Sequence, residues 1–171
     1  MRKSILFIVL LTAANLTASA QKFALIDMEY ILKNIPAYES SNEQLNQASK
    51  KYQSEVETLT QEAQALYKNY QSEATSLTET QKTKREEEIV AKEKSTAELK
   101  RKYFGPEGEL SKLRESLIKP IQDEIYNAVK EISEMKGYSV VVDRASANSI
   151  IFASPNIDIS NEVLARLGYS N

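Results

Sequence analysis

The side chains that most often carry proton transfer, thiol chemistry and zinc binding are absent from this sequence. It contains no His and no Cys, so the commonest general base, the thiol nucleophile and the best zinc ligands are missing. Its 4 glycines form no glycine-rich phosphate loop. Asp, Glu, Lys, Ser and Tyr remain as possible catalytic groups, but no spacing among them defines a site. The sequence therefore predicts a protein that is not an enzyme, with no catalytic, cofactor-binding or metal-binding residue.

Lys, Arg and Glu are instead concentrated over residues 82–104, where positive and negative charges are interspersed. Such a pattern is typical of a solvated helix face, whereas a ligand-binding basic patch would gather one sign of charge. The whole chain has a net charge of −2, and a nucleic-acid-binding domain would be strongly basic. We therefore expect charged helices and no nucleic-acid partner.

The first 20 residues have the layout of a secretory signal peptide. Arg2 and Lys3 precede an apolar run at 5–11, and small residues lead to Ala20, after which we expect cleavage. An uncleaved anchor is the alternative, but the run is shorter than the roughly 20 apolar residues that span a membrane. Loss of Arg2 and Lys3 takes the net charge from −2 to −4. An exported chain without cysteine must be stabilised by packing or association, which suits a bacterial periplasm.

Short apolar segments at both ends of the mature chain predict β-strands. Residues 23–26 (FALI), 138–142 (YSVVV) and 149–152 (SIIF) are rich in β-branched and aromatic side chains. The last two are joined by a polar stretch at 144–148, so they predict a β-hairpin.

Capping residues predict short helices beside these strands. Asp27 is placed to cap a helix that ends at Pro36, because the residue before proline is pushed out of the helical region. Ser160 is placed to cap a final helix that stops at Gly168.

Between these ends, residues 38–77 predict one long helix with a coiled-coil seam. Two interleaved series recur every seven residues, so that steps of three and four alternate. The predicted arm seam is Leu45, Tyr52, Val56, Leu59, Ala63, Leu66, Tyr70 and Leu77. At 1.5 Å per residue such a helix is about 60 Å long, too long for a compact domain of this size.

A polar, charge-poor segment at 76–83 predicts a reversal of the chain, with Thr78 or Thr80 capping a second helix. Ile89, Ala97 and Tyr103 give this second helix a thin apolar stripe. The two helices must then be antiparallel, and we expect Tyr52 to lie opposite Tyr103.

The sequence FGPEGEL at 104–110 interrupts the returning helix. Helix resumes at Leu110, with an apolar face that continues to Met135. Pro120 lies inside this stretch and is expected to kink it. Gly137 is placed to end it in the left-handed conformation.

The predicted strands are apolar on both faces, whereas a solvated three-stranded sheet should alternate. Their faces and edges therefore require partner strands, and a closed barrel built from several copies would provide them. The expected core of this oligomeric head is Phe23, Leu25, Val140, Val142, Ile150 and Phe152. The fold class is α+β, mostly α. Expected ranges are a signal peptide at 1–20, head at 21–37, helical hairpin arm at 38–119 and head again at 120–171.

Several segments together carry a family resemblance: KFALIDMEYIL after the signal, the low-glycine helical hairpin, GYSVVVDRAS, SIIFA and the ending DISNEVLARLG. The chain resembles the Skp (OmpH) family of periplasmic chaperones over the whole mature length. The resemblance implies a jellyfish-shaped homotrimer, with a β-barrel body and three helical arms around a client cavity. It implies clients that are unfolded outer-membrane proteins, and no catalysis, ATP or metal.

The net charge of this chain differs from that of the best-known members of the family. The best-known members are basic and are credited with contacts to anionic lipid or lipopolysaccharide, and the acidic mature chain argues against that activity here. The sequence thus predicts an ATP-independent periplasmic holdase that encloses unfolded outer-membrane precursors between its arms. The alternative is an envelope coiled-coil scaffold or adaptor that binds one folded partner.

Overall fold

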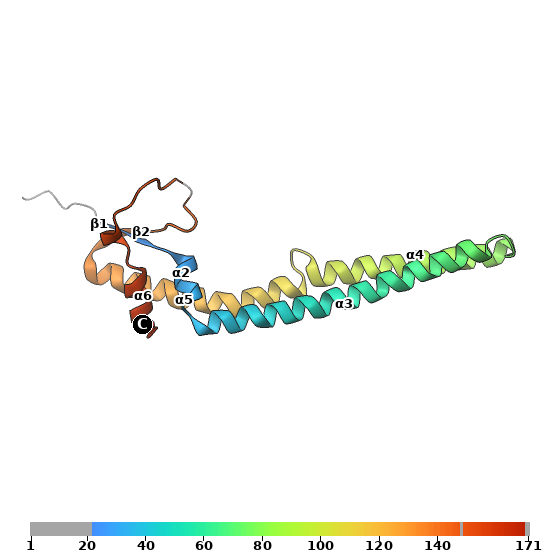
Figure 1. The fold of residues 1–171 in the computed structure, drawn as a ribbon, viewed down its shortest axis with the longest axis horizontal. Coiled ribbons are helices and arrows are strands. Elements are labelled where there is room, and N and C mark those ends of the chain that lie inside the picture. Colours follow the sequence, from blue (N-terminus) through green and yellow to red (C-terminus); the bar gives the residue numbers. More distant parts are fainter. Residues whose placement is uncertain (1–21, 148, 170–171) are drawn as a thin grey trace, which may run out of the picture. The chain divides into compact units, whose positions relative to one another are not determined.

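The computed structural model describes residues 22–147 and 149–169 (Figure 1). The predicted signal peptide lies outside the described residues. The chain divides into two compact units. The head unit contains the residues up to Asn34 and from Tyr126 onward, and the arm unit is Ile35–Ile125. The expected boundaries, at 37 and 119, stay a prediction.

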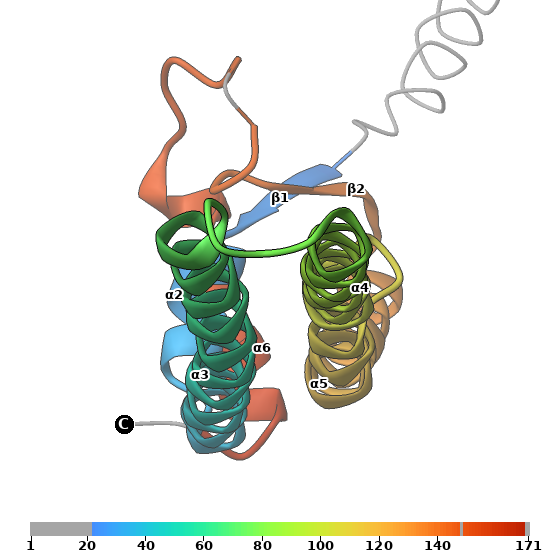
Figure 2. The same ribbon diagram turned by 90° about the vertical axis from the view of Figure 1, so that its right-hand side faces the viewer.

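The head unit is built around a two-stranded parallel sheet. Strand β1 (Lys22–Ile26) pairs with β2 (Tyr138–Asp143), placing Phe23 beside Val140 and Leu25 beside Val142. Both strands were predicted. The pairing is parallel because the chain leaves β1, passes through the arm and returns before entering β2, and the two strands lie side by side in Figures 1 and 2.

Two short helices complete the head unit. Helix α2 (Met28–Lys33) begins after Asp27, whose carboxylate accepts a hydrogen bond from the Tyr30 N–H at 2.8 Å, so the predicted cap is confirmed. Helix α6 (Ser160–Arg166) is followed by Gly168 at φ +86°, as predicted. The buried core of this unit is formed by Ala24, Leu25, Ile26, Ile31, Leu32, Ala128, Ile132, Ile159, Val163 and Leu164.

Two predictions for the head are wrong. Residues 149–152 form no strand, so there is no β-hairpin, because one chain offers no cover for a segment that is apolar on both faces and an isolated hairpin is marginal in water. Ser160 is not the N-cap of α6, which is Ile159. Asp158 accepts the Ser160 N–H instead, and the Ser160 hydroxyl accepts the N–H of Asp27.

The arm unit contains a long antiparallel helical hairpin. Helix α3 (Pro36–Glu73) and helix α4 (Glu79–Phe104) run side by side (Figure 2). Thr78 caps α4 in a capping box with Gln81, so of the two predicted candidates Thr78 is the cap.

The turn of this hairpin lies at residues 74–78, slightly before the predicted centre. The hydroxyls of Ser72 and Ser76 bond back to the carbonyls of Asn69 and Glu73. Such bonds compete with the helical ladder. Leu77 consequently lies in the turn and not in the helix as predicted.

Residues 105–108 separate α4 from helix α5 (Glu109–Lys136), as predicted. A Cβ at Gly108 would lie 2.7 Å from the carbonyl oxygen of Tyr103, so this tight break requires glycine there. Helix α5 is continuous across Pro120 and is followed by Gly137 at φ +71°, which confirms the predicted left-handed end. Among the helices described, none has the length and apolar character needed to cross a membrane.

Candidate functional site

The helices of the hairpin meet at an aromatic cluster formed by Tyr52, Tyr103 and Phe104. The rings of Tyr52 and Tyr103 stack with centroids 4.0 Å apart and an interplanar angle of 9°. The predicted pairing of these two residues is therefore confirmed. Phe104 meets both rings edge-on, at 6.4 and 6.5 Å. The cluster fixes the register of α3 against the last turn of α4, because offset and edge contacts of aromatic rings are directional.

Tyrosine–carboxylate hydrogen bonds add further links across the seam. The Tyr103 hydroxyl donates to Glu55 and the Tyr70 hydroxyl donates to Glu86. The bond to Glu55 raises the pKa of Tyr103 to about 12, and the bond to Glu86 raises the pKa of Tyr70. These phenols therefore stay protonated at neutral pH, where they act as hydrogen-bond donors and not as bases.

The buried side of α4 differs from the prediction. Ile89 and Tyr103 face the seam as expected, but Ala97 is exposed. The covered positions follow steps of three and four through Lys92, Thr96 and Leu99. Lys92 fits there because its aliphatic stem crosses the seam while its ammonium group pairs with Glu62 of α3. A polar residue in this role gives no hydrophobic signal in the sequence.

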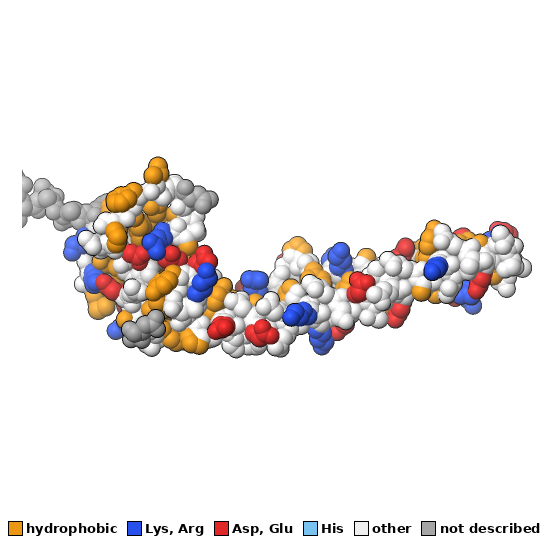
Figure 3. All heavy atoms as spheres, viewed as in Figure 1, with side chains coloured by type: hydrophobic (Ala, Val, Ile, Leu, Met, Phe, Trp, Pro, Cys, Tyr) orange, Lys and Arg blue, Asp and Glu red, His pale blue; other side chains and the backbone are white. Residues whose placement is uncertain are grey.

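The predicted seam residues of α3 differ in how deeply the hairpin interface buries them. Leu45 and Ala63 are buried, and Tyr52, Val56, Leu59, Leu66 and Tyr70 are half-buried. A seam that covers its apolar residues incompletely leaves part of their surface accessible along the arm. In Figure 3, hydrophobic side chains are scattered among charged ones over this hairpin.

One side of the hairpin carries a shallow groove between residues 50–67 of α3 and residues 93–104 of α4, here called the arm groove. It consists of two hollows of about 720 and 590 Å³ that share Val56, Glu57 and Lys100 in their lining. Phe104 lines the first hollow and Tyr67 the second, and their exposed fractions are 36% and 51%. The groove thus has an accessible aromatic ring at each end.

Neither of these two aromatic residues was predicted from the sequence as part of a site. Tyr67 directly follows the seam residue Leu66, and Phe104 directly follows Tyr103. A large aromatic side chain next to a seam position, where a coiled coil expects a polar residue, is the signal that could have identified them.

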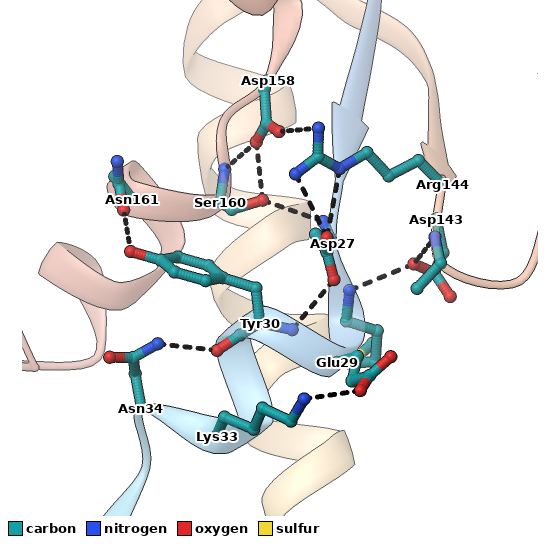
Figure 4. A network of polar contacts seen from close by, with 12 residues as sticks. Asp27, Glu29, Tyr30, Lys33, Asn34, Asp143, Arg144, Asp158, Ser160 and Asn161 are labelled. Atoms are coloured by element: carbon teal, nitrogen blue, oxygen red, sulfur yellow. Dashed lines mark hydrogen bonds and ion pairs between the residues drawn. The ribbon is translucent and has the colours of Figure 1, made fainter. Parts of the chain in front are cut away.

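In the head unit, a polar network closes the carboxyl ends of the two strands (Figure 4). Arg144, just after β2, pairs with Asp27 at 3.1 Å and with Asp158 at 3.3 Å. Tyr30 donates to Asn161 at 2.9 Å, which joins α2 to α6. The network ties the start of α2, the end of β2 and the C-terminal segment together.

Asp143 supports the same junction at the end of β2. Burial opposes its ionisation, but the hydrogen bond from the Met28 N–H at 3.0 Å and a second from the Ala145 N–H keep the pKa of Asp143 below its usual value. Its carboxylate is therefore ionised at neutral pH. These polar groups satisfy one another, which indicates a structural role.

The six residues predicted as the core of an oligomeric head differ in their exposure to solvent. Leu25 is buried, while Val142 and Ile150 are half-buried. Phe23, Val140 and Phe152 are 52%, 45% and 85% exposed, and the neighbouring Ile151 is fully exposed. In Figure 3 hydrophobic side chains gather around the loop of the head. Their role in an oligomer stays a prediction.

Within residues 22–147 and 149–169, no cluster of acidic side chains is arranged to hold a metal ion. A long antiparallel helical hairpin and a small parallel sheet define a mostly helical α+β protein. The chain belongs to the outer membrane protein (OmpH-like) family, whose model matches residues 22–167. This is the Skp family of periplasmic chaperones, which are not enzymes.

Individual relatives agree with this assignment. The chain is 26% identical to the chaperone protein Skp of Yersinia enterocolitica over 155 residues, covering 91% of each chain. It is 25% identical to the Skp protein of Pectobacterium atrosepticum over 157 residues, covering 92% of each. An OmpH-like outer membrane chaperone candidate of Caulobacter crescentus has the same fold, with a TM-score of 0.65 at 13% identity over 85% of this chain and 82% of that one.

Proposed function

We propose that this chain is an ATP-independent periplasmic holdase that encloses unfolded outer-membrane protein precursors between helical arms and prevents their aggregation. The observation that carries the proposal is the family match over residues 22–167 in a chain whose arm has a partly apolar surface. Precursors of outer-membrane barrels expose long stretches of alternating apolar residues, which aggregate in water unless they are covered.

The arm suits such clients because it is long and its apolar surface is dispersed. Helix α3 has 38 residues, which gives about 57 Å at 1.5 Å per residue. Tyr67, Val90 and Phe104 are accessible along the hairpin, surrounded by charged side chains. Many weak apolar contacts favour an unfolded chain over one folded partner, which would need a concentrated interface.

Several copies are needed to enclose a client. We propose a homo-oligomer of three chains joined through their heads, with Phe23, Val140, Ile151 and Phe152 in the contact. Their exposure in the single chain supports this, since large exposed apolar patches mark interaction sites. Export to the periplasm would follow cleavage after Ala20.

Removal of the arm tests the function. Because Tyr52 and Tyr103 stack at 4.0 Å, a short glycine-containing turn can join Gln53 to Tyr103 in place of residues 54–102. We expect the shortened protein to keep the same number of chains per oligomer as the full-length protein, because its head strands are intact. We expect it to lose protection of a urea-diluted barrel protein in light scattering.

Two results would contradict the proposal. Equal protection by the shortened and full-length proteins at equal concentration would mean that the arms are not the client clamp. Binding to one native envelope protein, without protection of unfolded barrels, would favour the adaptor alternative. Sedimentation of both proteins serves as the control, since a change in the number of chains per oligomer would itself alter the cavity.

A further inference from the structure

The seam of the hairpin holds two tyrosine rings face to face. Tyr52 of α3 and Tyr103 of α4 stack with ring centroids 4.0 Å apart and ring planes inclined by 9°. Tyr103 is 8% exposed and Tyr52 is half-buried. Phe104 meets both rings edge-on and so borders the pair. Among the described residues, the phenol ring in contact with each of these tyrosines is therefore the other tyrosine.

Each phenol of this pair has its own carboxylate partner. The Tyr103 hydroxyl donates a hydrogen bond to Glu55, and the Tyr52 hydroxyl donates one to Glu109. Hydrogen bonds from Lys102 and Tyr52 keep the pKa of Glu109 below its usual value, against the opposing effect of burial, so this carboxylate is ionised at neutral pH. A phenol that loses an electron becomes a strong acid. A carboxylate already bonded to the hydroxyl can therefore take the proton as the electron leaves.

The composition of the chain directs one-electron oxidation to tyrosine. Tryptophan and cysteine, the other side chains that readily give up a single electron, are absent from the sequence, whereas tyrosine occurs 9 times. Methionine is oxidised mainly by oxygen transfer, which gives the sulfoxide. An electron removed from this chain is therefore lost from a tyrosine. Burial of the stacked pair keeps other reactants away from its rings, so a radical formed there meets the second tyrosine first.

We propose that Tyr52 and Tyr103 form a modification site, at which a one-electron oxidant joins the two rings into a dityrosine cross-link between α3 and α4. Each phenol loses one electron to the oxidant and one proton to its carboxylate, which gives two tyrosyl radicals. The radicals combine by a carbon–carbon bond between positions ortho to the hydroxyls. The two ring hydrogens then move to the phenoxyl oxygens, and the carboxylates release their protons to water. Two equivalents of oxidant are reduced, and the protein loses two hydrogen atoms.

Such a cross-link would stabilise the hairpin in a chain that cannot form a disulfide, since the sequence has no cysteine. It would enclose residues 53–102 in a covalent loop and fix the register of α3 against α4. A covalent loop restricts the unfolded chain, so the closed hairpin should resist unfolding more strongly than the open one. This property belongs to the hairpin itself and does not depend on the proposed holdase function.

Treatment of the full mature protein with hexachloroiridate(IV), a small one-electron oxidant, tests the proposal at neutral pH. Dityrosine is followed by its fluorescence, and the cross-link is located by mass spectrometry of tryptic peptides. We expect one linked pair of peptides that contains Tyr52 and Tyr103 and is lighter than the separate peptides by two hydrogen atoms. The product should still run as a single chain in a denaturing gel. The variant Tyr52→Phe should lose this product while its helical circular dichroism is retained, because the ring that stacks on Tyr103 remains.

The matched control is Tyr70→Phe. The Tyr70 hydroxyl also donates to a carboxylate, that of Glu86, but within the described part of the chain no aromatic ring stacks on Tyr70. This variant should form the cross-link between Tyr52 and Tyr103 in the same yield as the unaltered protein. The variant Glu55→Gln should form it more slowly, because a neutral amide accepts the phenolic proton less readily than a carboxylate.

The proposal is overturned if Tyr52→Phe yields as much dityrosine as the unaltered protein, or if the linked peptides join other tyrosines or different chains. Consumption of the oxidant without any dityrosine would overturn it too, as would an equal loss of product in Tyr70→Phe. An unchanged rate in Glu55→Gln would refute the role given to the carboxylate as proton acceptor.

Discussion

Tyr103 combines two roles at one position of the seam. Its ring stacks on Tyr52 and its hydroxyl donates to Glu55 of the opposite helix. The carboxylate favours the protonated phenol, which is why the pKa of Tyr103 rises to about 12. A raised pKa means that this hydrogen bond stabilises the fold fully below pH 10 and is lost as the pH rises toward 12.

The first prediction concerns this pair. In Glu55→Gln the neutral amide should let the Tyr103 phenol titrate nearer its ordinary pKa, because no negative charge then opposes phenolate formation. Ultraviolet phenolate absorbance, taken as the difference between each protein and its Tyr103→Phe counterpart, measures the change. An unchanged titration of Tyr103 in Glu55→Gln would show that Glu55 does not set its pKa.

Individual contacts between the two helices could be predicted from the sequence where the residues of the seam are apolar. Tyr52 and Tyr103 were paired by their equal distance from the turn, and the stack confirms it. Ala97 was placed wrongly because Lys92 and Thr96 occupy covered positions that an apolar pattern cannot reveal. The aromatic ends of the arm groove depend on which side of each helix remains uncovered, and this requires the packed hairpin.

The turn of the hairpin leads into a capping box at the start of α4. Thr78 accepts the Gln81 N–H, and the Gln81 side chain accepts the Thr78 N–H at 2.9 Å. This reciprocal pair satisfies donors that α4 would otherwise leave free at its start.

The second prediction is that Thr78→Ala loosens the start of α4. Loss of the cap should cost about 1 kcal/mol of helix stability and speed amide hydrogen exchange in the first turn of α4. Thr80→Ala is the control, because Thr80 lies inside the first turn and does not serve as the cap. Equal exchange in both variants would contradict the assignment of Thr78.

Helices and strands were predictable to different extents for a physical reason. The bounds of α3, α4 and α5 follow from local signals, namely a seven-residue repeat, a capping threonine and glycines at the break. The segment at 149–152 has strand-forming residues, but a strand also requires a neighbour, and the single chain provides none. Its conformation therefore does not follow from strand-forming residues alone.

For the whole molecule, the third prediction tests assembly through the head. Val140 and Phe152 are 45% and 85% exposed in the single chain, so their replacement by Asp should leave each chain folded. In an oligomer the same carboxylates would be buried without partners, which costs several kcal/mol each. We expect the double variant Val140→Asp, Phe152→Asp to sediment as a single chain with its helical circular dichroism retained.

The matched control replaces Val90 of the arm by Asp, because its exposed fraction of 61% lies between those of Val140 and Phe152. This change should leave the sedimenting mass unaltered, since Val90 is remote in sequence from every head segment. A double variant of Val140 and Phe152 that kept the full mass would exclude these residues from the contact between copies.

The parallel pairing of β1 with β2 has a consequence for the order of folding. The first strand to emerge must wait for a partner that begins at Tyr138, and closing so long a loop costs entropy. The hairpin of α3 and α4 rests on contacts closer in the sequence, so it can fold first and bring its own ends together. An emerging chain would thus gain its arm before its sheet, and the proposed association of heads could follow only once β2 has been added.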